Sequence, residues 1–190
     1  GGRVLPLWSA TPPAWLVDEP HLKMSIAIQE ETAWRELAPS QRGAFGIFGA
    51  NMAFRRELFD RVGGFSLELG PQGEKPIRSE EPEFIKRVLA TGARVAFDPA
   101  SVVWHHVGPE RMRREYYRRH EFYLGKGTSR FQGPPTSRHV LGVAPHHVTL
   151  LAARAGDWLS TRLRNDPEAF CAEVELCGAL GSAVGSFEAA

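Results

Sequence analysis

Proline and glycine divide this chain into short segments. Its 190 residues include 14 prolines and 19 glycines. Proline fixes φ and withholds a backbone donor, and glycine commonly ends helices, so regular elements are expected to be brief where these residues are frequent. Residues 3–8 (RVLPLW) are apolar and strand-forming, and Pro12 and Pro13 follow them closely. We predict a short strand there, followed by a loop that carries Trp15.

The next apolar stretch has the composition of a strand. It covers residues 45–54 (FGIFGANMAF) and contains Gly46 and Gly49, which indicate a bulge or a close backbone approach. A short helix is predicted over residues 56–62, ended by Gly63. Residues 64–78 are rich in glycine, proline and charge without periodicity, which predicts a loop.

A second helix is predicted to begin at Glu81. The residue before a proline avoids the αR region, whereas proline itself suits the first helical turn, so Glu81 and Pro82 mark a helix start. Gly92 marks the helix end. One apolar stripe lies between them at helical spacing, formed by Phe84, Ile85, Val88 and Leu89.

Alternating apolar residues follow this helix. Residues 95–97 and 101–107 predict two strands, and the Asp-Pro pair at residues 98–99 predicts a turn between them. Successive side chains of a strand point to opposite faces, so only one of His105 and His106 can face a given site.

The rest of the chain is expected to be helical. An arginine-rich helix is predicted over residues 109–124, ended by Gly125 and Gly127. The cluster of Gly, Pro and Ser that follows is the best candidate for a boundary, which divides the chain into residues 1–127 and a helical extension over residues 128–190. Two apolar stripes at helical spacing lie in that extension, formed by Val148, Leu151, Ala155, Trp158 and Leu159, and by Phe170, Val174, Cys177 and Leu180.

The composition excludes several classes of protein. The 23 basic and 22 acidic side chains leave a net charge of +1, which gives no reason to expect a polyanion as the main partner. We find no apolar run of the roughly 20 residues that cross a bilayer, and no targeting signal. Cys171 and Cys177 match no metal or redox spacing, which is typical of free thiols in a reducing compartment such as the cytoplasm.

Three clusters of polar residues could carry chemistry. Glu80 and Glu81 stand at a helix start, His105 and His106 end a strand, and arginines fill residues 109–124. Each cluster also has an ordinary structural explanation: acidic residues complement a helix dipole, and arginines often form a solvated helix face. Arginines interleaved with tyrosines also suit a nucleic acid or an anionic surface, which is the alternative function that the sequence leaves open.

The order of these features resembles the C-terminal half of glycosyltransferase family 2, a family of inverting enzymes with a GT-A fold. The resemblance covers residues 1 to about 125 and is carried by GANMAFRRELFDRVGGF and SEEPEFIKRVLATGARVAFDPASVVWHHVGPERM, with GGRVLP and PAWL near the start. The positions typical of the family are held by Gly49, Asn51, Arg55 or Arg56, residues 62–65, Glu80, Glu81, Arg87, residues 97–99 and His105. The resemblance implies an α/β fold, a partial GT-A domain whose mixed sheet has flanking helices, plus the C-terminal helical extension.

The resemblance also implies a reaction. A sugar would pass from a nucleotide sugar to an acceptor hydroxyl with inversion, and Glu81, beside Glu80, would take the proton of that hydroxyl. His105 would be a ligand of a divalent metal, Mn²⁺ or Mg²⁺, and Arg111 would add positive charge near the leaving diphosphate. Further substrate contacts would come from Asn51, Arg55 and Trp15.

Two departures from the family pattern limit this expectation. Glu81 stands where the family commonly has Asp, and the extra methylene moves the carboxylate by about 1.5 Å. The β-α-β donor-binding half that ends in Asp-x-Asp has no counterpart in this sequence. We therefore expect these 190 residues alone to be an inactive fragment that binds nucleotide sugar poorly.

The expected partners follow from the same resemblance. They are a nucleotide sugar and an acceptor that is a glycan, a lipid or a small molecule, without nucleic acid. The expected location is cytoplasmic. Trp158 with Arg154, Arg162 and Arg164 also leaves open a peripheral contact of the C-terminal helices with the inner face of a membrane.

Overall fold

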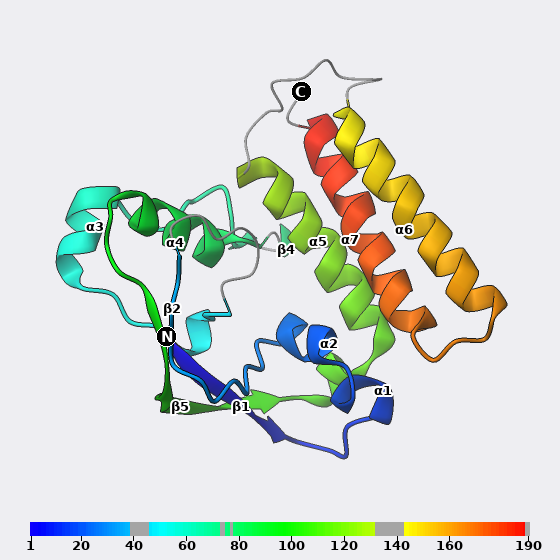
Figure 1. The fold of residues 1–190 in the computed structure, drawn as a ribbon, viewed down its shortest axis with the longest axis horizontal. Coiled ribbons are helices and arrows are strands. Elements are labelled where there is room, and N and C mark those ends of the chain that lie inside the picture. Colours follow the sequence, from blue (N-terminus) through cyan, green and yellow to red (C-terminus); the bar gives the residue numbers. More distant parts are fainter. Residues whose placement is uncertain (39–45, 73–74, 77, 132–142, 189–190) are drawn as a thin grey trace. The chain divides into compact units, whose positions relative to one another are not determined.

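The computed structural model of the protein describes residues 1–38, 46–72, 75–76, 78–131 and 143–188. The chain forms two compact units (Figure 1). The first consists of Gly1–Glu68 and Glu80–Met112, and the second of Leu69–Ser79 and Arg113–Ala190. The predicted division into residues 1–127 and 128–190 stays a prediction about domain organisation.

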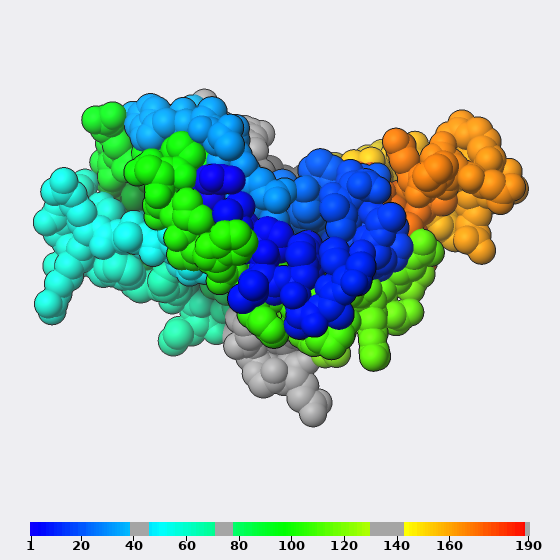
Figure 2. Space-filling model, turned by 90° about the horizontal axis from the view of Figure 1, so that it is seen from below, coloured from blue at the N-terminus to red at the C-terminus, as the bar shows by residue number. Residues whose placement is uncertain are grey.

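A small mixed sheet organises the first unit. Within the described residues it has three strands in the order β1 (Gly2–Trp8), β5 (Ala96–Val107) and β2 (Arg35–Glu36). β1 runs parallel to β5, and the two lie side by side as dark blue and green atoms in Figure 2. The strand predicted over residues 3–8 and the mixed α/β class are confirmed.

Pro6 is compatible with β1 because this strand lies at the sheet edge. Val4, two residues earlier, exchanges both of its backbone hydrogen bonds with Gln29 on the side away from β5, at 2.9 Å each. Alternate residues of a parallel strand direct their backbone groups to the same side, so the nitrogen of Pro6 also faces away from β5. The missing N–H therefore costs no bond of the ladder.

The turn predicted at residues 98–99 is wrong. β5 is one continuous strand, and its pairing with β1 skips from Gly2–Asp98 to Arg3–Val102. The amide of Ala100 donates to Oδ1 of Asp98 at 2.9 Å. The extra residues are therefore absorbed as a bulge, and the chain keeps its direction.

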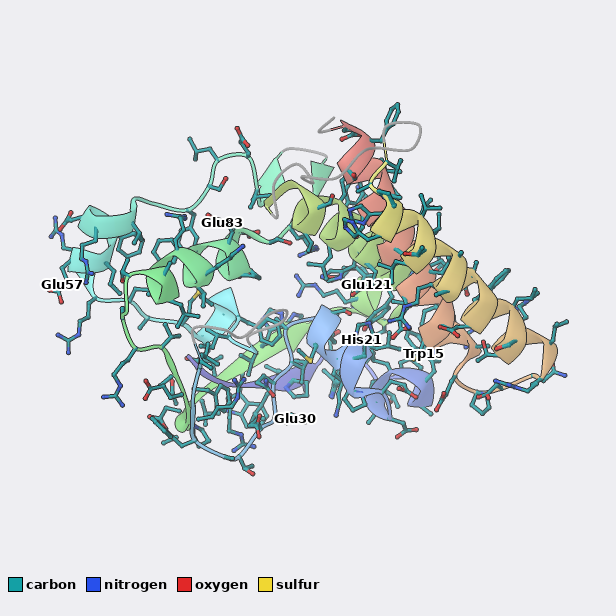
Figure 3. All side chains as sticks on the ribbon, turned by 45° about the horizontal axis from the view of Figure 1, so that its top comes forward. Trp15, His21, Glu30, Glu57, Glu83 and Glu121 are labelled. Carbon is teal, nitrogen blue, oxygen red and sulfur yellow. The ribbon has the colours of Figure 1, made fainter. Side chains whose placement is uncertain are left out.

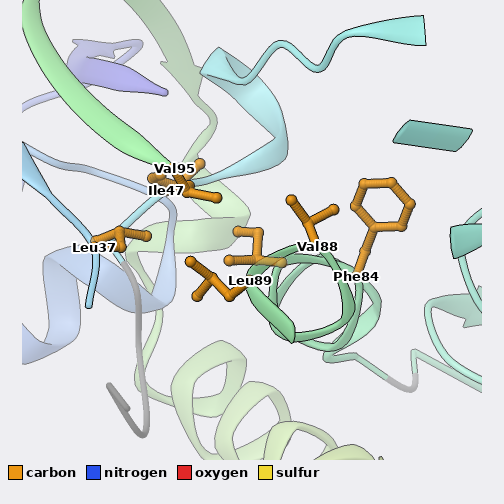
Figure 4. Packing of buried hydrophobic residues seen from close by; sticks show 7 residues of the cluster. Leu37, Ile47, Phe84, Val88, Leu89 and Val95 are labelled. Carbon is orange, nitrogen blue, oxygen red and sulfur yellow. The ribbon is translucent and has the colours of Figure 1, made fainter. Parts of the chain in front are cut away.

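Helix α4 (Glu80–Ala90) supplies much of the core of this unit. Its predicted stripe is confirmed, because all four apolar side chains are buried. They pack with Leu37, Ile47 and Val95 in one cluster (Figure 4). Gly92 follows the helix with a left-handed φ of 78°, as a helix end requires. The helix begins one residue earlier than predicted.

Phe45 lies outside the described residues. For residues 46–54, the predicted strand is wrong. Gly49–Asn51 form a 3₁₀ turn, η1, between extended residues. The helix predicted after it is confirmed as α3 (Arg56–Val62), and Gly63 follows it with φ 78°. The side chain of Arg87 fixes this end, because its guanidinium donates to the carbonyls of Val62 and Gly64.

The remaining elements of the first unit are short. α1 (Ala14–Val17) and α2 (Pro20–Ser25) follow β1, and the 3₁₀ turn η2 (Pro109–Met112) follows β5. The helix predicted from residue 109 therefore begins as a separate turn, and the α-helix starts at Arg114.

Three long helices dominate the second unit, α5 (Arg114–Phe131), α6 (Pro145–Leu163) and α7 (Ala169–Glu188). They lie side by side in Figure 1, with α7 packed on both α5 and α6. The short strands β3 (Pro71–Gln72) and β4 (Lys75–Pro76) form a two-stranded ladder in the segment predicted as a loop. The helices predicted from the two apolar stripes near the C-terminus are present as α6 and α7.

The prediction that Gly125 and Gly127 end a helix is wrong, because α5 continues to Phe131. A Cβ at Gly125 would overlap the backbone oxygen of Gly178 on α7, and one at Gly127 would overlap the backbone of Arg78. These glycines therefore permit close approach of neighbouring backbones.

The prediction that no apolar run could cross a bilayer is wrong for α7, which is the one described helix long and apolar enough to do so by length and composition alone. It has 20 residues, and 33% of its most apolar stretch, which has a mean hydropathy of 1.2, is buried. Two of its carboxylates are paired within the unit, Glu173 with Arg118 and Glu175 with Arg154. Both pairs join it to neighbouring helices of the bundle.

The helix packing predicts opposite effects for two glycine substitutions. Gly156 on α6 has open space where a Cβ would stand, so Gly156→Ala should raise the free energy of unfolding by about 0.5–1 kcal/mol. A Cβ at Gly181 on α7 would overlap the backbone of Phe122, so Gly181→Ala should lower it by about 1–3 kcal/mol. Urea unfolding followed by circular dichroism measures both, and a Gly181→Ala variant as stable as the wild type would contradict this packing.

Candidate functional site

The site residues predicted from the sequence all lie in the first unit. They are Trp15 on α1, Asn51 on η1, Arg55 just before α3, Glu80 and Glu81 at the start of α4, His105 on β5 and Arg111 on η2.

Glu81 is held by a backbone donor. Its Oε1 accepts a hydrogen bond of 2.9 Å from the amide of Gly49 on η1. The first turn of α4 also contains Glu80 and Glu83, and negative charge is stabilised at a helix N-terminus. The carboxylate of Glu81 therefore has a defined position although the side chain is only half-buried.

The backbone immediately before the acidic pair is strained. Ser79 has a φ of 91°, a region that non-glycine residues rarely adopt, and its side chain is 2% exposed. Its Oγ lies 3.2 Å from Oγ1 of Thr128, within the second unit. Strained residues persist where the surrounding structure fixes them, and they cluster at functional sites.

Asn51 links the two parallel strands. Its Nδ2 donates to the carbonyls of Arg3 on β1, at 2.8 Å, and Ser101 on β5, at 3.1 Å, and its Oδ1 accepts from Oγ of Ser101 at 3.0 Å. A side chain thus takes hydrogen bonds that a further strand would otherwise make. This explains why the surrounding residues form a turn despite their strand-like composition, and it gives Asn51 a structural role. Its predicted contact with substrate stays a prediction.

His105 and Arg111 form a second cluster near the carboxyl end of β5. Nη1 of Arg111 lies 2.7 Å from Nε2 of His105, and the guanidinium can only donate, so this nitrogen is the acceptor. Burial is the main cause that lowers the pKa of His105 below its ordinary 6.5, and the charges of Arg111 and His106 lower it further. The imidazole is therefore neutral at pH 7.

The contacts of Asn51 and the pair of His105 and Arg111 lie at different points of the same strand pair. Asn51 is bonded to Ser101, and His105 is four residues farther along β5, which is roughly 13 Å at 3.3 Å per residue. Trp15 follows the carboxyl end of β1 on α1, a half-buried residue near the helix that carries His21 (Figure 3). Ligands of parallel sheets commonly bind beyond the carboxyl ends of the strands, where His105, Arg111 and Trp15 lie.

Arg55 does not belong to this group by position. It lines a cavity of about 460 Å³ together with Gly1, Arg61 and Arg94 at the amino ends of β1 and β5. The described lining residues of this cavity do not include Glu81 or His105. The role of Arg55 in binding substrate stays a prediction.

The described residues offer an incomplete metal site. Across the described ranges there is no group of three or more His, Cys, Asp or Glu that could hold a metal ion. In addition, the guanidinium of Arg111 occupies Nε2 of His105. These residues by themselves do not fit a bound divalent metal, so such a metal would need ligands from elsewhere.

The arginine-rich helix is engaged within its own unit. On α5, Arg118 donates to both carboxylate oxygens of Glu173, at 2.8 and 3.2 Å, and the guanidinium of Arg114 lies over the ring of Phe170. These contacts give the arginines a role in packing α5 against α7. They supply no observation that favours the alternative function, binding of a nucleic acid or anionic surface.

Sequence reasoning missed the role of Gly49 and the strain at Ser79. The sequence marks Gly49 as a position of close backbone approach, but the direction of its N–H depends on the 3₁₀ turn. Ser79 stands directly before the acidic pair, yet no sequence pattern marks a left-handed serine.

Comparison with characterised proteins supports a relationship to glycosyltransferases. The chain is similar to the glucosyl-dolichyl phosphate glucuronosyltransferase of Haloferax volcanii, with 29% identity over 106 residues. The match covers 55% of this chain and 32% of that protein, so it spans about a third of the relative's length. No protein-family model matches the chain, and no solved structure matches it. The small mixed sheet with its helices is compatible with part of a glycosyltransferase fold.

The contact between Arg111 and His105 predicts a pH titration. The midpoint of His105, measured by NMR and assigned with a His105→Gln variant, should lie below 6.5, and Arg111→Gln should raise it by removing a nearby positive charge. Because burial is the larger cause, the midpoint should still stay below 6.5 in that variant. The unfolded chain binds this proton first on acidification, so His105 should reduce stability as the pH falls below about 6.5.

An exposed arginine provides the control for this titration. Arg113 is exposed and two residues from Arg111, and Arg113→Gln should leave the midpoint of His105 nearly unchanged. Equal midpoints in the wild type and in Arg111→Gln would contradict the contact.

Proposed function

We propose that this chain forms the acceptor side of an inverting glycosyltransferase of family 2 with a GT-A fold. An acceptor hydroxyl attacks the anomeric carbon of a nucleotide sugar, the bond from that carbon to the diphosphate breaks, and the nucleoside diphosphate leaves with the bonding electrons. The hydroxyl proton goes to Glu81. The match to a glycosyltransferase supports the class of reaction, and the residues described above support the roles.

The fixed carboxylate of Glu81 is the observation that carries this proposal. A general base must keep its direction toward the proton that it removes, because small displacements are costly in rate. The amide of Gly49 holds one carboxylate oxygen, and the helix start restrains the backbone. Glu80, the first member of the acidic pair, is included in the site as its neighbour in the same turn.

Arg111 and His105 serve the leaving group. The guanidinium is always charged and offsets the charge that develops on the diphosphate. The neutral imidazole of His105 orients Arg111 through their hydrogen bond. The proposed base thus lies on α4, bonded to η1, whereas the diphosphate-binding residues lie at and just after the carboxyl end of β5.

The remaining contacts belong to the same proposal. Trp15 stacks on a sugar ring. The substrate contacts predicted for Asn51 and Arg55 are given no step, because the amide group of Asn51 binds the strands and Arg55 lies at their amino ends. The divalent metal predicted from the sequence, Mn²⁺ or Mg²⁺, is given no step in this proposal, because the described residues do not fit one.

The acceptor is a glycan, a lipid or a small molecule, and the name of the Haloferax relative favours a lipid-linked sugar. A cytoplasmic protein that touches the inner face of a membrane fits such an acceptor. Apolar side chains on α6 support that contact, since Val148, Leu159 and Leu163 are 47%, 52% and 75% exposed. Exposed apolar residues along one helix suit the boundary between headgroups and acyl chains.

Donor binding is assigned to residues outside this sequence. These 190 residues contain no Asp-x-Asp motif, and the relative is much longer than the matched segment. Titration of UDP-glucose and UDP-glucuronic acid into the chain with Mn²⁺ should therefore give little or no heat in a calorimeter. Tight binding by these residues alone would contradict the assignment.

Replacement of Glu81 tests the proposed base. In the complete protein that contains this sequence, assayed with a panel of nucleotide sugars and lipid-linked or free acceptors, Glu81→Gln should lower kcat about 10²- to 10⁴-fold, because proton removal is lost. Donor affinity should be retained. The matched control is Glu168→Gln, an exposed glutamate of the second unit, which should transfer sugar at the wild-type rate. Retained turnover in Glu81→Gln would remove Glu81 as the base.

A further inference from the structure

Gly49 contacts the carboxylate of Glu81 in two ways. Its amide donates to Oε1 at 2.9 Å, and its α-carbon lies so close that a Cβ there would overlap the same oxygen. The other near neighbour of such a Cβ is Cε of Met52 at 3.6 Å, an ordinary contact distance. The space around Gly49 is therefore restricted mainly by the oxygen that its own amide holds.

The backbone gives no separate reason for glycine at this position. Gly49 is not among the glycines with positive φ, which are Gly46, Gly63, Gly70 and Gly92 in the described residues. An alanine would fit the main-chain conformation of η1. Its Cβ would displace the carboxylate at the flexible end of the Glu81 side chain. The fold can therefore tolerate the change, but the carboxylate cannot keep its position.

The turn that carries this amide is itself fixed. The amide of Asn51 closes η1 on the carbonyl of Phe48 at 2.9 Å, and its side chain binds the carbonyls of Arg3 and Ser101. The donor on Gly49 is thus tied to both parallel strands. A carboxylate oxygen bound to it takes its position from the sheet as well as from α4.

We propose that Gly49 is a positioning residue that sets the direction of the Glu81 carboxylate, through its N–H and through the absence of a side chain. This inference rests on the proposed function, since it concerns the residue assigned there as the base. Gly49→Ala removes the space for Oε1 and turns the carboxylate away from the hydroxyl that it deprotonates.

The hydrogen bond has a spectroscopic signature that needs no activity. In ¹⁵N-labelled chain, Glu81→Ala removes the acceptor, so the Gly49 amide proton should move upfield and exchange faster with solvent. Glu80→Ala is the control, because Glu80 is the neighbour in the same turn and should leave the Gly49 resonance nearly unchanged. A Gly49 amide that does not respond to Glu81→Ala would overturn the inference.

Kinetics of the complete protein test the positioning role. Gly49→Ala should lower kcat about 10- to 100-fold with the KM for the nucleotide sugar nearly unchanged, because a base displaced by an ångström loses rate without loss of donor binding. The matched control is Gly64→Ala, since a Cβ at Gly64 meets nothing within 4 Å and its φ is not left-handed. That variant should keep the wild-type kcat.

The outcomes separate the two proposals. Wild-type kcat in Gly49→Ala together with loss of transfer in Glu81→Gln overturns the role of Gly49 and leaves Glu81 as the base. Full transfer in Glu81→Gln overturns the proposed function, and the role of Gly49 with it. If Gly49→Ala does not fold, the response of the Gly49 amide to Glu81→Ala decides the inference.

Discussion

The side chain of Asn51 connects the parts of the first unit on which the candidate site depends. Its amide group binds carbonyls of both parallel strands, and the 3₁₀ turn that it closes presents the Gly49 amide to Glu81. Backbone carbonyls accept hydrogen bonds, and here one side chain donates to those of half-buried Arg3 and exposed Ser101 where a further strand could have done so. The position of the acidic pair relative to β5 follows from this connection.

The proposed base and the proposed diphosphate-binding residues lie in different places. The carboxylate of Glu81 is fixed by a neutral backbone donor, whereas Arg111 brings positive charge to His105 near the carboxyl end of β5. The proposed base and the cationic group thus lie near different parts of the strand pair. Such separation suits the proposed displacement, in which the acceptor hydroxyl loses its proton on one face of the anomeric carbon and charge develops on the diphosphate that leaves from the opposite face.

The elements that were predictable are those with a strong local signal. The apolar stripe of α4 and the glycine after α3 follow from periodicity and backbone preference, and the acidic pair at a helix start follows from proline chemistry. The turn at Gly49 could not be predicted, because its composition suits a strand and the Asn51 contacts that override this come from residues about 50 positions away. Gly125 illustrates a similar ambiguity: glycine signals both a helix end and close packing, and only the position of Gly178 decides between them.

The central claim is that Glu81 and the pair of Arg111 and His105 serve one sugar nucleotide. A crystal structure of the complete protein with a bound nucleoside diphosphate and acceptor tests it most directly. The account predicts that the diphosphate contacts Arg111 and that the carboxylate of Glu81, still bonded to Gly49, lies within hydrogen-bond distance of the acceptor hydroxyl. A diphosphate bound away from Arg111, with Glu81 remote from the acceptor, would contradict it.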